Sequence, residues 1–330
     1  MRRLRRPAIS LPTLIGDGKG SLQATENLRT RASDPVVALS FPDHWNASDV
    51  RGALYAMHGR VCAYCQGDLP HNDPGDVEHF RPKSVYWWLA YEFANYLLSC
   101  AKCNRVCKRK EFPLPRGVAP WVWEKRDQIQ EEQILLLDPV VDDVEAWFRV
   151  ERRDDVLFFL APVAGYGADF NIGMRIKTTI RFFRLNSPFL IKQRSRTIYR
   201  ALQALDQALG GDDLRAQEVR QMASRFHPHG TAIRQILTER APELIPSPEE
   251  ELLHLVMDLI YELKLADASL AQSRGNPSDL RFRAEILWAL AVLWKDPPAG
   301  SSHLVKSLLV KAKRWDEVNG LIQNWANSFA

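Results

Sequence analysis

Two Cys-x-x-Cys pairs constrain this chain more than any other feature. Cys62-Ala-Tyr-Cys65 and Cys100-Ala-Lys-Cys103 are separated by 34 residues, and together with Cys107 they fit within 46 residues that hold every cysteine of the chain. Four thiolates in two such pairs suit one tetrahedral metal ion, so the sequence predicts a structural Zn²⁺ site. The alternative, a redox-active pair, would need a βαβ context that the sequence does not show. Cys107 could compete with Cys103 for the ion, but we expect it to be a small, buried apolar residue instead.

Composition places the chain among globular proteins. Of its 330 residues, 46% are hydrophobic and 25% are charged, which favours about two packed domains over disorder. No apolar run reaches the ~18 residues of a membrane-spanning helix. The basic start, Met1 to Pro7, is followed by a short apolar stretch without a small-residue cleavage site. We therefore expect a cytoplasmic protein with no membrane partner.

The periodicity predicts an α+β fold that is mostly helical. We expect three parts: an extended arm over 1–44, a domain over 45–165 that holds the cysteine pairs and a β-hairpin, and a helical region over 166–330. Short strands are expected at 77–80 and 86–89, a basic helix from the second cysteine pair to Pro113, and hairpin strands at 146–151 and 156–160, turning through 152–155. Helices are expected to start at Ser187-Pro188 and Ser247-Pro248 and to cover 279–295 and 302–327.

Charge is distributed unevenly along the chain. Residues 1–200 hold 30 Lys and Arg against 23 Asp and Glu, whereas residues 201–330 hold 14 against 17. Two runs contain no acid: 102–110 has five basic residues and 171–200 has eight. A solvated helix face explains one such run, but two runs beside a metal cluster favour a polyanionic partner such as nucleic acid. The region 210–330, in contrast, is acidic and shows no chemical motif.

Between and after the cysteine pairs lies an ordered set of polar residues. The chain reads Asp76-Val-Glu78-His79-Phe-Arg-Pro-Lys, then Asn95 before the second pair and Asn104 directly after it. Here the sequence resembles the HNH endonuclease family, whose core is a ββα-metal finger often stapled by a four-cysteine zinc site. The resemblance covers roughly 60–114. It implies a zinc-stapled HNH finger embedded in a predominantly helical protein, with 45–165 as the nuclease domain.

Further motifs resemble one subfamily, the HNH nuclease subunit of Septu-type and retron-associated antiphage systems. They are the Arg-rich start, Cys-Ala-Tyr-Cys, Glu-His-Phe-Arg-Pro-Lys, Phe112-Pro-Leu114, Leu135-Leu-Leu-Asp-Pro139 and Thr179-Ile…Leu185-Asn with the Arg-rich helix after it. The match extends to about residue 210. It implies an ABC-type ATPase partner and a role in defence against phage.

The residue types fit phosphodiester hydrolysis. His79 can serve as a general base near neutral pH, and Glu78 and Asn104 offer hard oxygen ligands that suit a catalytic Mg²⁺ or Mn²⁺. In the family pattern the acid binds the metal, the histidine activates water, and Asn95 holds the loop and orients the base. Asp76 should share a strand face with Glu78 and is a candidate supporting acid.

We expect a set of cations to contact nucleic acid, most simply DNA: Arg81, Lys83, Lys102, Arg105, Lys108, Arg109, Lys110, Arg181 and Arg184. One departure concerns Lys108, which follows Asn104 by four residues where the family usually has a Lys after three; Arg105 could substitute for it.

Three alternatives stay open from the sequence. The first is an RNA nuclease of the same fold, acting for example on tRNA, because the chemistry acts on a backbone. The second is a zinc-dependent nucleic-acid-binding module without catalysis, in which His79 is structural. The third is a protein–protein scaffold, for which nucleic-acid affinity would be weak.

Overall fold

Helices dominate the computed structural model of the chain, which describes residues 1–15, 21–32, 40–70, 73–153, 157–165, 170–273, 275–298 and 301–327. The residues group into two compact units built from separate segments. The first unit comprises 1–4, 60–78 and 98–247, and the second comprises 5–59, 79–97 and 248–330. The mostly helical α+β class expected from the sequence is confirmed.

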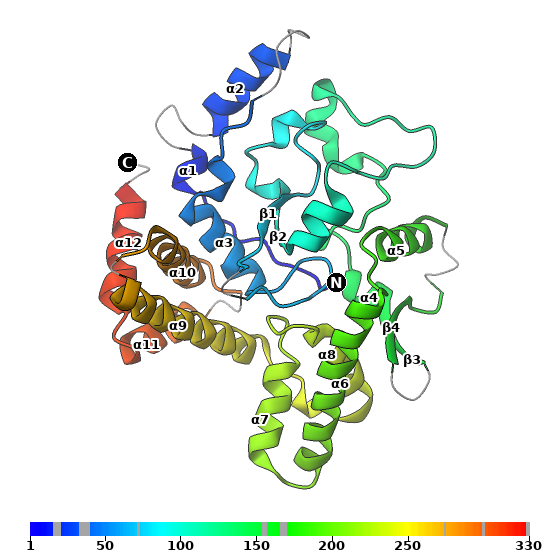
Figure 1. Ribbon diagram of the computed structural model, residues 1–330, viewed down its shortest axis with the longest axis vertical. Coiled ribbons are helices and arrows are strands. Elements are labelled where there is room, and N and C mark those ends of the chain that lie inside the picture. The colour runs from blue at the N-terminus through cyan, green and yellow to red at the C-terminus, as the bar shows by residue number, and fades with distance from the viewer. Residues whose placement is uncertain are drawn as a thin grey trace. The chain divides into compact units, whose positions relative to one another are not determined.

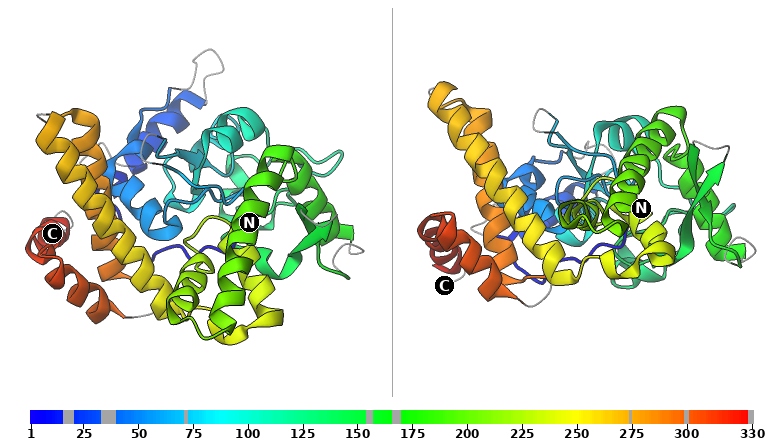
Figure 2. Two further views of the ribbon diagram at one scale, coloured as in Figure 1. Left: turned by 60° about the horizontal axis from the view of Figure 1, so that its bottom comes forward. Right: turned by 90° about the horizontal axis from the view of Figure 1, so that it is seen from below.

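The second unit is helical. Its α-helices are α1 (Pro12–Ile15), α2 (Ser21–Ala32), α3 (Ser48–His58), α9 (Pro248–Ser273), α10 (Pro277–Lys295), α11 (Ser302–Lys311) and α12 (Trp315–Asn327), and three short 3₁₀ turns span His44–Asn46, Trp87–Leu89 and Phe93–Asn95. α10 is the hub, since it packs against α3, α9, α11 and α12. Figure 1 shows α3 beside α10, and both views of Figure 2 show α9 running along α10.

The first unit combines helices with a hairpin. Its elements are a π-helix over Lys102–Lys108, a 3₁₀ segment over Trp123–Glu131, α4 (Val144–Trp147), β3 (Phe148–Arg153), β4 (Leu157–Pro162), α5 (Phe170–Phe182), α6 (Pro188–Leu209), α7 (Asp213–Met222), α8 (Gly230–Arg240) and a 3₁₀ turn over Pro242–Leu244. β3 and β4 pair antiparallel from Phe148 opposite Pro162 to Arg153 opposite Leu157. The expected hairpin is confirmed, although 154–156 of its turn lie outside the described residues.

A second small sheet contains two strands, β1 (Asp76–His79) and β2 (Tyr96–Ser99). The strand expected at 77–80 is confirmed within one residue. The strand expected at 86–89 is wrong: Trp87–Leu89 form a 3₁₀ turn in which the Leu89 amide donates to the Tyr86 carbonyl at 2.9 Å. A short apolar run does not by itself distinguish a strand from a buried turn.

Two further expectations need correction. The arm over 1–44 is not simply extended, because it contains α1 and α2 and buries Leu11, Leu14 and Leu28. The Asp49 carboxylate accepts hydrogen bonds from the Thr13 amide and hydroxyl, at 2.9 and 2.8 Å, and so holds the start of α1. The single helix expected over 302–327 is two helices, since Lys313 has a left-handed backbone (φ 58°) that ends α11.

The described residues include no helix both long enough and apolar enough to cross a membrane.

Candidate metal and catalytic site

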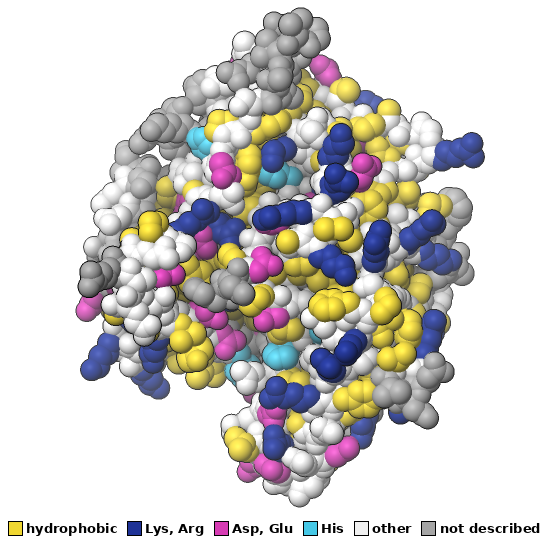
Figure 3. Space-filling view, viewed as in Figure 1, with side chains coloured by type: hydrophobic (Ala, Val, Ile, Leu, Met, Phe, Trp, Pro, Cys, Tyr) yellow, Lys and Arg dark blue, Asp and Glu magenta, His cyan; other side chains and the backbone are white. Residues whose placement is uncertain are grey.

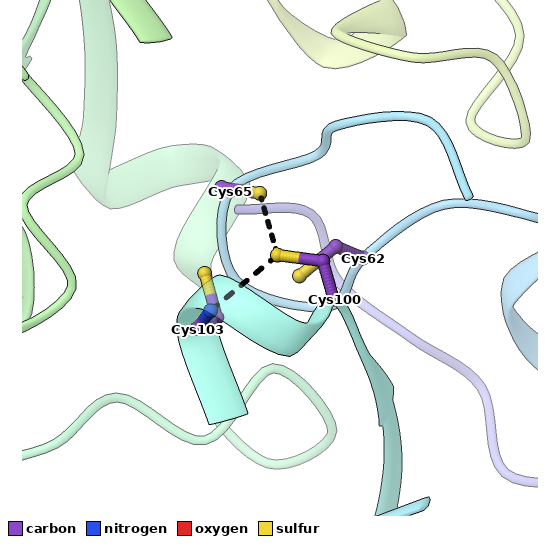
Figure 4. Close-up of side chains that lie close together, drawn as sticks. All are labelled: Cys62, Cys65, Cys100 and Cys103. Carbon is purple, nitrogen blue, oxygen red and sulfur yellow. Dashed lines mark hydrogen bonds between the residues drawn. The ribbon is translucent and has the colours of Figure 1, made fainter. Parts of the chain in front are cut away.

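The four predicted zinc ligands come together in the first unit. The Sγ atoms of Cys62, Cys65, Cys100 and Cys103 all lie within 4.8 Å of one another, and Figure 4 shows the sulfurs pointing toward a common centre. Three of the four side chains are buried and Cys100 is half-buried. Four converging thiols shielded from solvent fit the tetrahedral ligand set of structural zinc.

The backbone around each pair is shaped for this cluster. In the first pair the Cys62 amide donates to the Gly67 carbonyl at 3.0 Å, and Gln66 takes a positive φ of 60°, which closes a tight turn. The Gly67 amide then donates to Cys65 Sγ at 3.4 Å. In the second pair the Cys103 amide donates to Cys100 Sγ at 3.4 Å. Such amide donors favour the thiolate form that binds metal.

Cys107 lies outside the cluster, half-buried on the π-helix. Burial is the main cause that raises the pKa of its thiol. Cys107 is less buried than the sequence predicted, because its side chain is only half-buried. It is separate from the four metal ligands, as predicted.

Asp76 and Asn104 form a polar pair beside the cluster. Asn104 Nδ2 donates to Asp76 Oδ2 at 3.0 Å. The Arg105 guanidinium binds the same carboxylate with two hydrogen bonds, of 2.8 and 2.5 Å. Asp76 therefore holds the amide that the sequence assigned to a divalent ion.

Glu78 is buried against a lysine. Lys108 Nζ lies 2.6 Å from Glu78 Oε1, and the exposed fractions of the two side chains are only 1% and 2%. Burial raises the pKa of Glu78 to about 7, with the Lys108 ammonium opposing the shift. Glu78, the only carboxylate predicted to bind the divalent ion, is thus already paired with a cation of the chain.

A π-helix explains how Lys108 reaches Glu78. The Arg109 amide donates to the Asn104 carbonyl at 2.6 Å, a bond between residues five apart instead of four. The wider turn absorbs one extra residue, so Lys108, four positions after Asn104, takes a place near that of a residue three positions on in an α-helix. The basic helix expected to run to Pro113 thus ends at Lys108, where Arg109 adopts a positive φ of 52°.

These contacts do not fit a divalent ion held by Glu78 and Asn104 as arranged. Hard cations need free carboxylate and carbonyl oxygens. Glu78 Oε1 faces an ammonium, and the whole carboxylate is nearly inaccessible to solvent.

His79 sits in an aromatic pocket of the second unit. Its Nε2 lies 2.9 Å from the Ala90 carbonyl; because that oxygen only accepts, Nε2 carries a hydrogen, and in the neutral imidazole the basic nitrogen is then Nδ1. The Tyr96 hydroxyl donates to the same carbonyl at 2.7 Å. The rings of Trp45 and Tyr96 meet the imidazole edge-on, each 5.0 Å away. The imidazole orientation is therefore fixed from several sides.

Asn95 ties together the loop that supplies Ala90. Its Oδ1 accepts from the Arg81 amide at 2.8 Å, and its Nδ2 donates to the Arg81 and Leu89 carbonyls at 2.9 and 3.1 Å. Its own carbonyl accepts from the Phe80 amide at 2.8 Å. The buried side-chain amide of Asn95 thus holds both ends of the segment 81–89, which runs from the end of β1 to the end of the 3₁₀ turn over Trp87–Leu89.

The predicted nucleic-acid contacts divide by exposure. Six are exposed in the first unit: Lys102, Arg105, Arg109, Lys110, Arg181 and Arg184. Figure 3 shows Lys and Arg side chains spread over the part of this unit that holds α5 and α6. In the second unit Lys83 lies over the Trp45 ring, with Nζ 4.1 Å from its centroid.

Two of the predicted contacts lie elsewhere. Lys108 is buried on Glu78, and Arg81 is buried, with its guanidinium near the Phe80 and Tyr86 rings. A contact with a phosphate group requires an exposed side chain, and neither Lys108 nor Arg81 is exposed.

Part of the second acid-free run is also structural. Arg175 pairs with Asp142 at 2.5 Å, and Arg200 pairs with Glu218 at 2.7 Å. The buried Arg194 donates to the Phe158 and Leu185 carbonyls at 3.0 and 2.7 Å. Acids from other segments therefore neutralise two of the charges that look unpaired in the sequence, and main-chain carbonyls accept hydrogen bonds from a third.

Fold and site together define a mostly helical protein with two small two-stranded sheets and a buried four-thiol centre suited to zinc. Part of the chain is distantly homologous to Septu protein PtuB. It is 31% identical over 121 residues to the protein of that name from Bacillus mycoides (strain KBAB4), a match covering 31% of this chain and 39% of that protein. It is 36% identical over 61 residues to Septu protein PtuB from Bacillus thuringiensis, covering 18% of this chain and 24% of that protein.

The chain thus spans less than half the length of either of these curated relatives. No family model matches the sequence, and no solved structure matches it.

Three contacts of the site were not evident from the sequence. They are the Ala90 carbonyl on His79, the Trp45 ring beside it, and the Lys108 ammonium on Glu78. The spacing of Lys108 from Asn104 was the one available signal, since the extra residue marks a local change in helix type.

Proposed function

We propose that this protein is an HNH-type endonuclease that hydrolyses phosphodiester bonds of DNA, with His79 as general base. The observation that carries the proposal is the His79 imidazole, held at Nε2 by the Ala90 carbonyl so that Nδ1 remains the basic nitrogen. A carbonyl bond that selects one tautomer is a common way to orient a catalytic histidine. The similarity to Septu protein PtuB agrees with the family resemblance of the sequence.

In the proposed reaction, His79 Nδ1 takes a proton from a water molecule as the water oxygen attacks the phosphorus. A new P–O bond forms while the bond to the leaving sugar oxygen breaks, and that oxygen takes up a proton from a water molecule to become a hydroxyl. Asn95 is a positioning residue in this scheme, because it holds the loop that carries the Ala90 carbonyl. The exposed cations of the first unit would bind the polyanionic backbone.

A Mg²⁺ or Mn²⁺ ion, when bound, would supply charge neutralisation at the phosphate. Glu78 and Asn104 are the residues proposed for it from the sequence. Both side chains already have partners within the protein: Glu78 pairs with Lys108, and Asn104 Nδ2 donates to Asp76.

We further propose that the protein acts in the cytoplasm as the effector nuclease of an antiphage system, together with an ABC-type ATPase. The similarity to Septu protein PtuB is the support for this role. The acidic helical region 210–330 would be available for docking such a partner.

The test is a cleavage assay on the wild type and His79→Ala, with and without the proposed ABC-type ATPase partner. A supercoiled plasmid and a labelled tRNA pool, each with Mg²⁺ and with Mn²⁺, distinguish DNA from RNA as substrate. Removing a general base should lower the rate by roughly 10²–10⁴-fold. His303→Ala, which changes an exposed histidine of α11, is the matched control and should cut at the wild-type rate.

Three outcomes would contradict the DNA nuclease. Cleavage of tRNA alone would transfer the activity to RNA. Binding without cleavage by the wild type would favour a zinc-dependent binding module. Cleavage by His79→Ala at the wild-type rate would place the activity at another site.

A further inference from the structure

The Glu78–Lys108 pair is unusual for its burial. An ion pair that is exposed at the protein surface contributes little to stability. The side chains of Glu78 and Lys108, in contrast, are almost fully enclosed. Burying a carboxylate and an ammonium costs free energy that only close pairing offsets. The 2.6 Å separation of Nζ and Oε1 meets that requirement.

The placement of Lys108 depends on a rare element. The π-helix over Lys102–Lys108 brings its last residue against β1, where Glu78 lies. A π-helix is rarely used in proteins and recurs at functional sites. The chain therefore uses an irregular turn to put one ammonium on one acid.

The surrounding groups separate Glu78 from the more exposed polar pair. Asp76 lies two residues away on the same strand but binds Arg105 and Asn104 instead. Each acid therefore has its own cation: the exposed Arg105 binds Asp76, and the buried Lys108 binds Glu78.

We propose that Lys108 is the resident counter-cation of Glu78, so that a divalent cation reaches Glu78 only by displacing the Lys108 ammonium. This inference rests on the proposed function, because the family resemblance assigns Glu78 to a metal. It differs from that function in what it claims: direct competition between a side chain of this protein and the ion for one carboxylate.

The test measures Mn²⁺ binding by calorimetry, without any cleavage assay. Lys108→Ala leaves room beside Glu78, and Lys108→Gln keeps a hydrogen-bond donor to it while removing the charge. Both variants should bind Mn²⁺ at least about tenfold more tightly than the wild type, a change of roughly 1.4 kcal/mol. Combining either with Glu78→Gln should abolish the gain. Lys110→Ala removes an exposed lysine nearby and should leave the affinity unchanged.

A second measurement uses the wild type and does not depend on how the variants fold. Amine acetylation followed by mass spectrometry should modify Lys108 poorly without Mn²⁺ and readily with it, because the displaced ammonium becomes accessible. Lys110 should react equally in both conditions.

Equal Mn²⁺ affinity in wild type and variants, a gain that survives Glu78→Gln, or Lys108 labelling that ignores Mn²⁺ would each overturn the proposal. Failure of the nuclease proposal would appear in the cleavage assay instead, so the two are distinguishable.

Discussion

Asn95 shows how much a single buried side chain can organise. Its amide makes three hydrogen bonds to main-chain groups of Arg81 and Leu89. The family resemblance assigned the central Asn a loop-holding role, and the observed contacts tie down the same loop that presents Ala90 to His79. Its role in catalysis stays a prediction.

Replacing Asn95 by Asp tests the donor side of its amide separately from the acceptor side. The acceptor for the Arg81 amide is kept, but the two amide donors become a carboxylate oxygen facing two carbonyls. We expect a loss of about 2 kcal/mol in the free energy of unfolding, because buried carbonyls lose their donors. Denaturant unfolding measures the loss, and the cleavage rate should fall with it.

Asn171→Asp makes the same chemical change at an exposed position of α5. It should shift stability by less than about 0.5 kcal/mol. Equal effects at the two positions would mean that the contacts of Asn95 do not matter.

At the scale of elements, the close packing of α3 against α10 requires a glycine at position 52. A Cβ built on Gly52 would lie 2.6 Å from the Glu285 carbonyl oxygen and 2.9 Å from the Ala289 nitrogen, and would collide with the Trp288 Cβ. Close by, Arg51 and Glu285 form a buried ion pair with N and O 2.8 Å apart. The segment before the first cysteine pair is therefore packed directly on a helix from near the end of the chain.

Gly52→Ala should separate these helices. Overpacking of this kind costs roughly 1–3 kcal/mol, which outweighs the gain in helix propensity. Thermal unfolding would show the loss as a lower Tm.

The control is Gly320→Ala in α12, where a new Cβ would meet nothing within 4 Å. There Ala should stabilise the protein by about 0.5–1 kcal/mol. Stabilisation at Gly52 as well would show that the two helices are not in close contact.

At the scale of the whole molecule, the four thiols join two segments that are distant in sequence. Residues 60–78 and 98–247 belong to one compact unit, and two cysteines come from each segment. A metal ion at this point would cross-link them and contribute on the order of 10 kcal/mol to folding.

Cys62→Ser should therefore lower both the zinc content and the thermal stability, and a strong chelator should do the same to the wild type. Elemental analysis and thermal unfolding measure the two effects. Cys107→Ser changes a cysteine outside the cluster and should keep the zinc. Full zinc content in Cys62→Ser would contradict this assignment.

Local patterns in the sequence were sufficient for several features. The spacing of the cysteines predicted which four converge, because each tight Cys-x-x-Cys turn brings its two thiols close together. Helix starts at Ser187-Pro188 and Ser247-Pro248 and the hairpin over 148–162 were predictable, because caps, prolines and alternation act over a few residues. Two features were not predictable: Lys313 takes a left-handed backbone that is usual for Gly or Asn, and the short apolar run over Trp87–Leu89 fits a strand as well as a turn.

By itself, the sequence determined the helical class, the four-cysteine cluster and the order of the polar residues around it. Only the tertiary structure decided which partner each charge has: Lys108 with Glu78, Arg105 with Asp76, and Arg175 with Asp142. The physical reason is range. Turns and helix caps are set by neighbours along the chain, whereas the charge state of a buried acid depends on which cation the fold brings within a few ångströms.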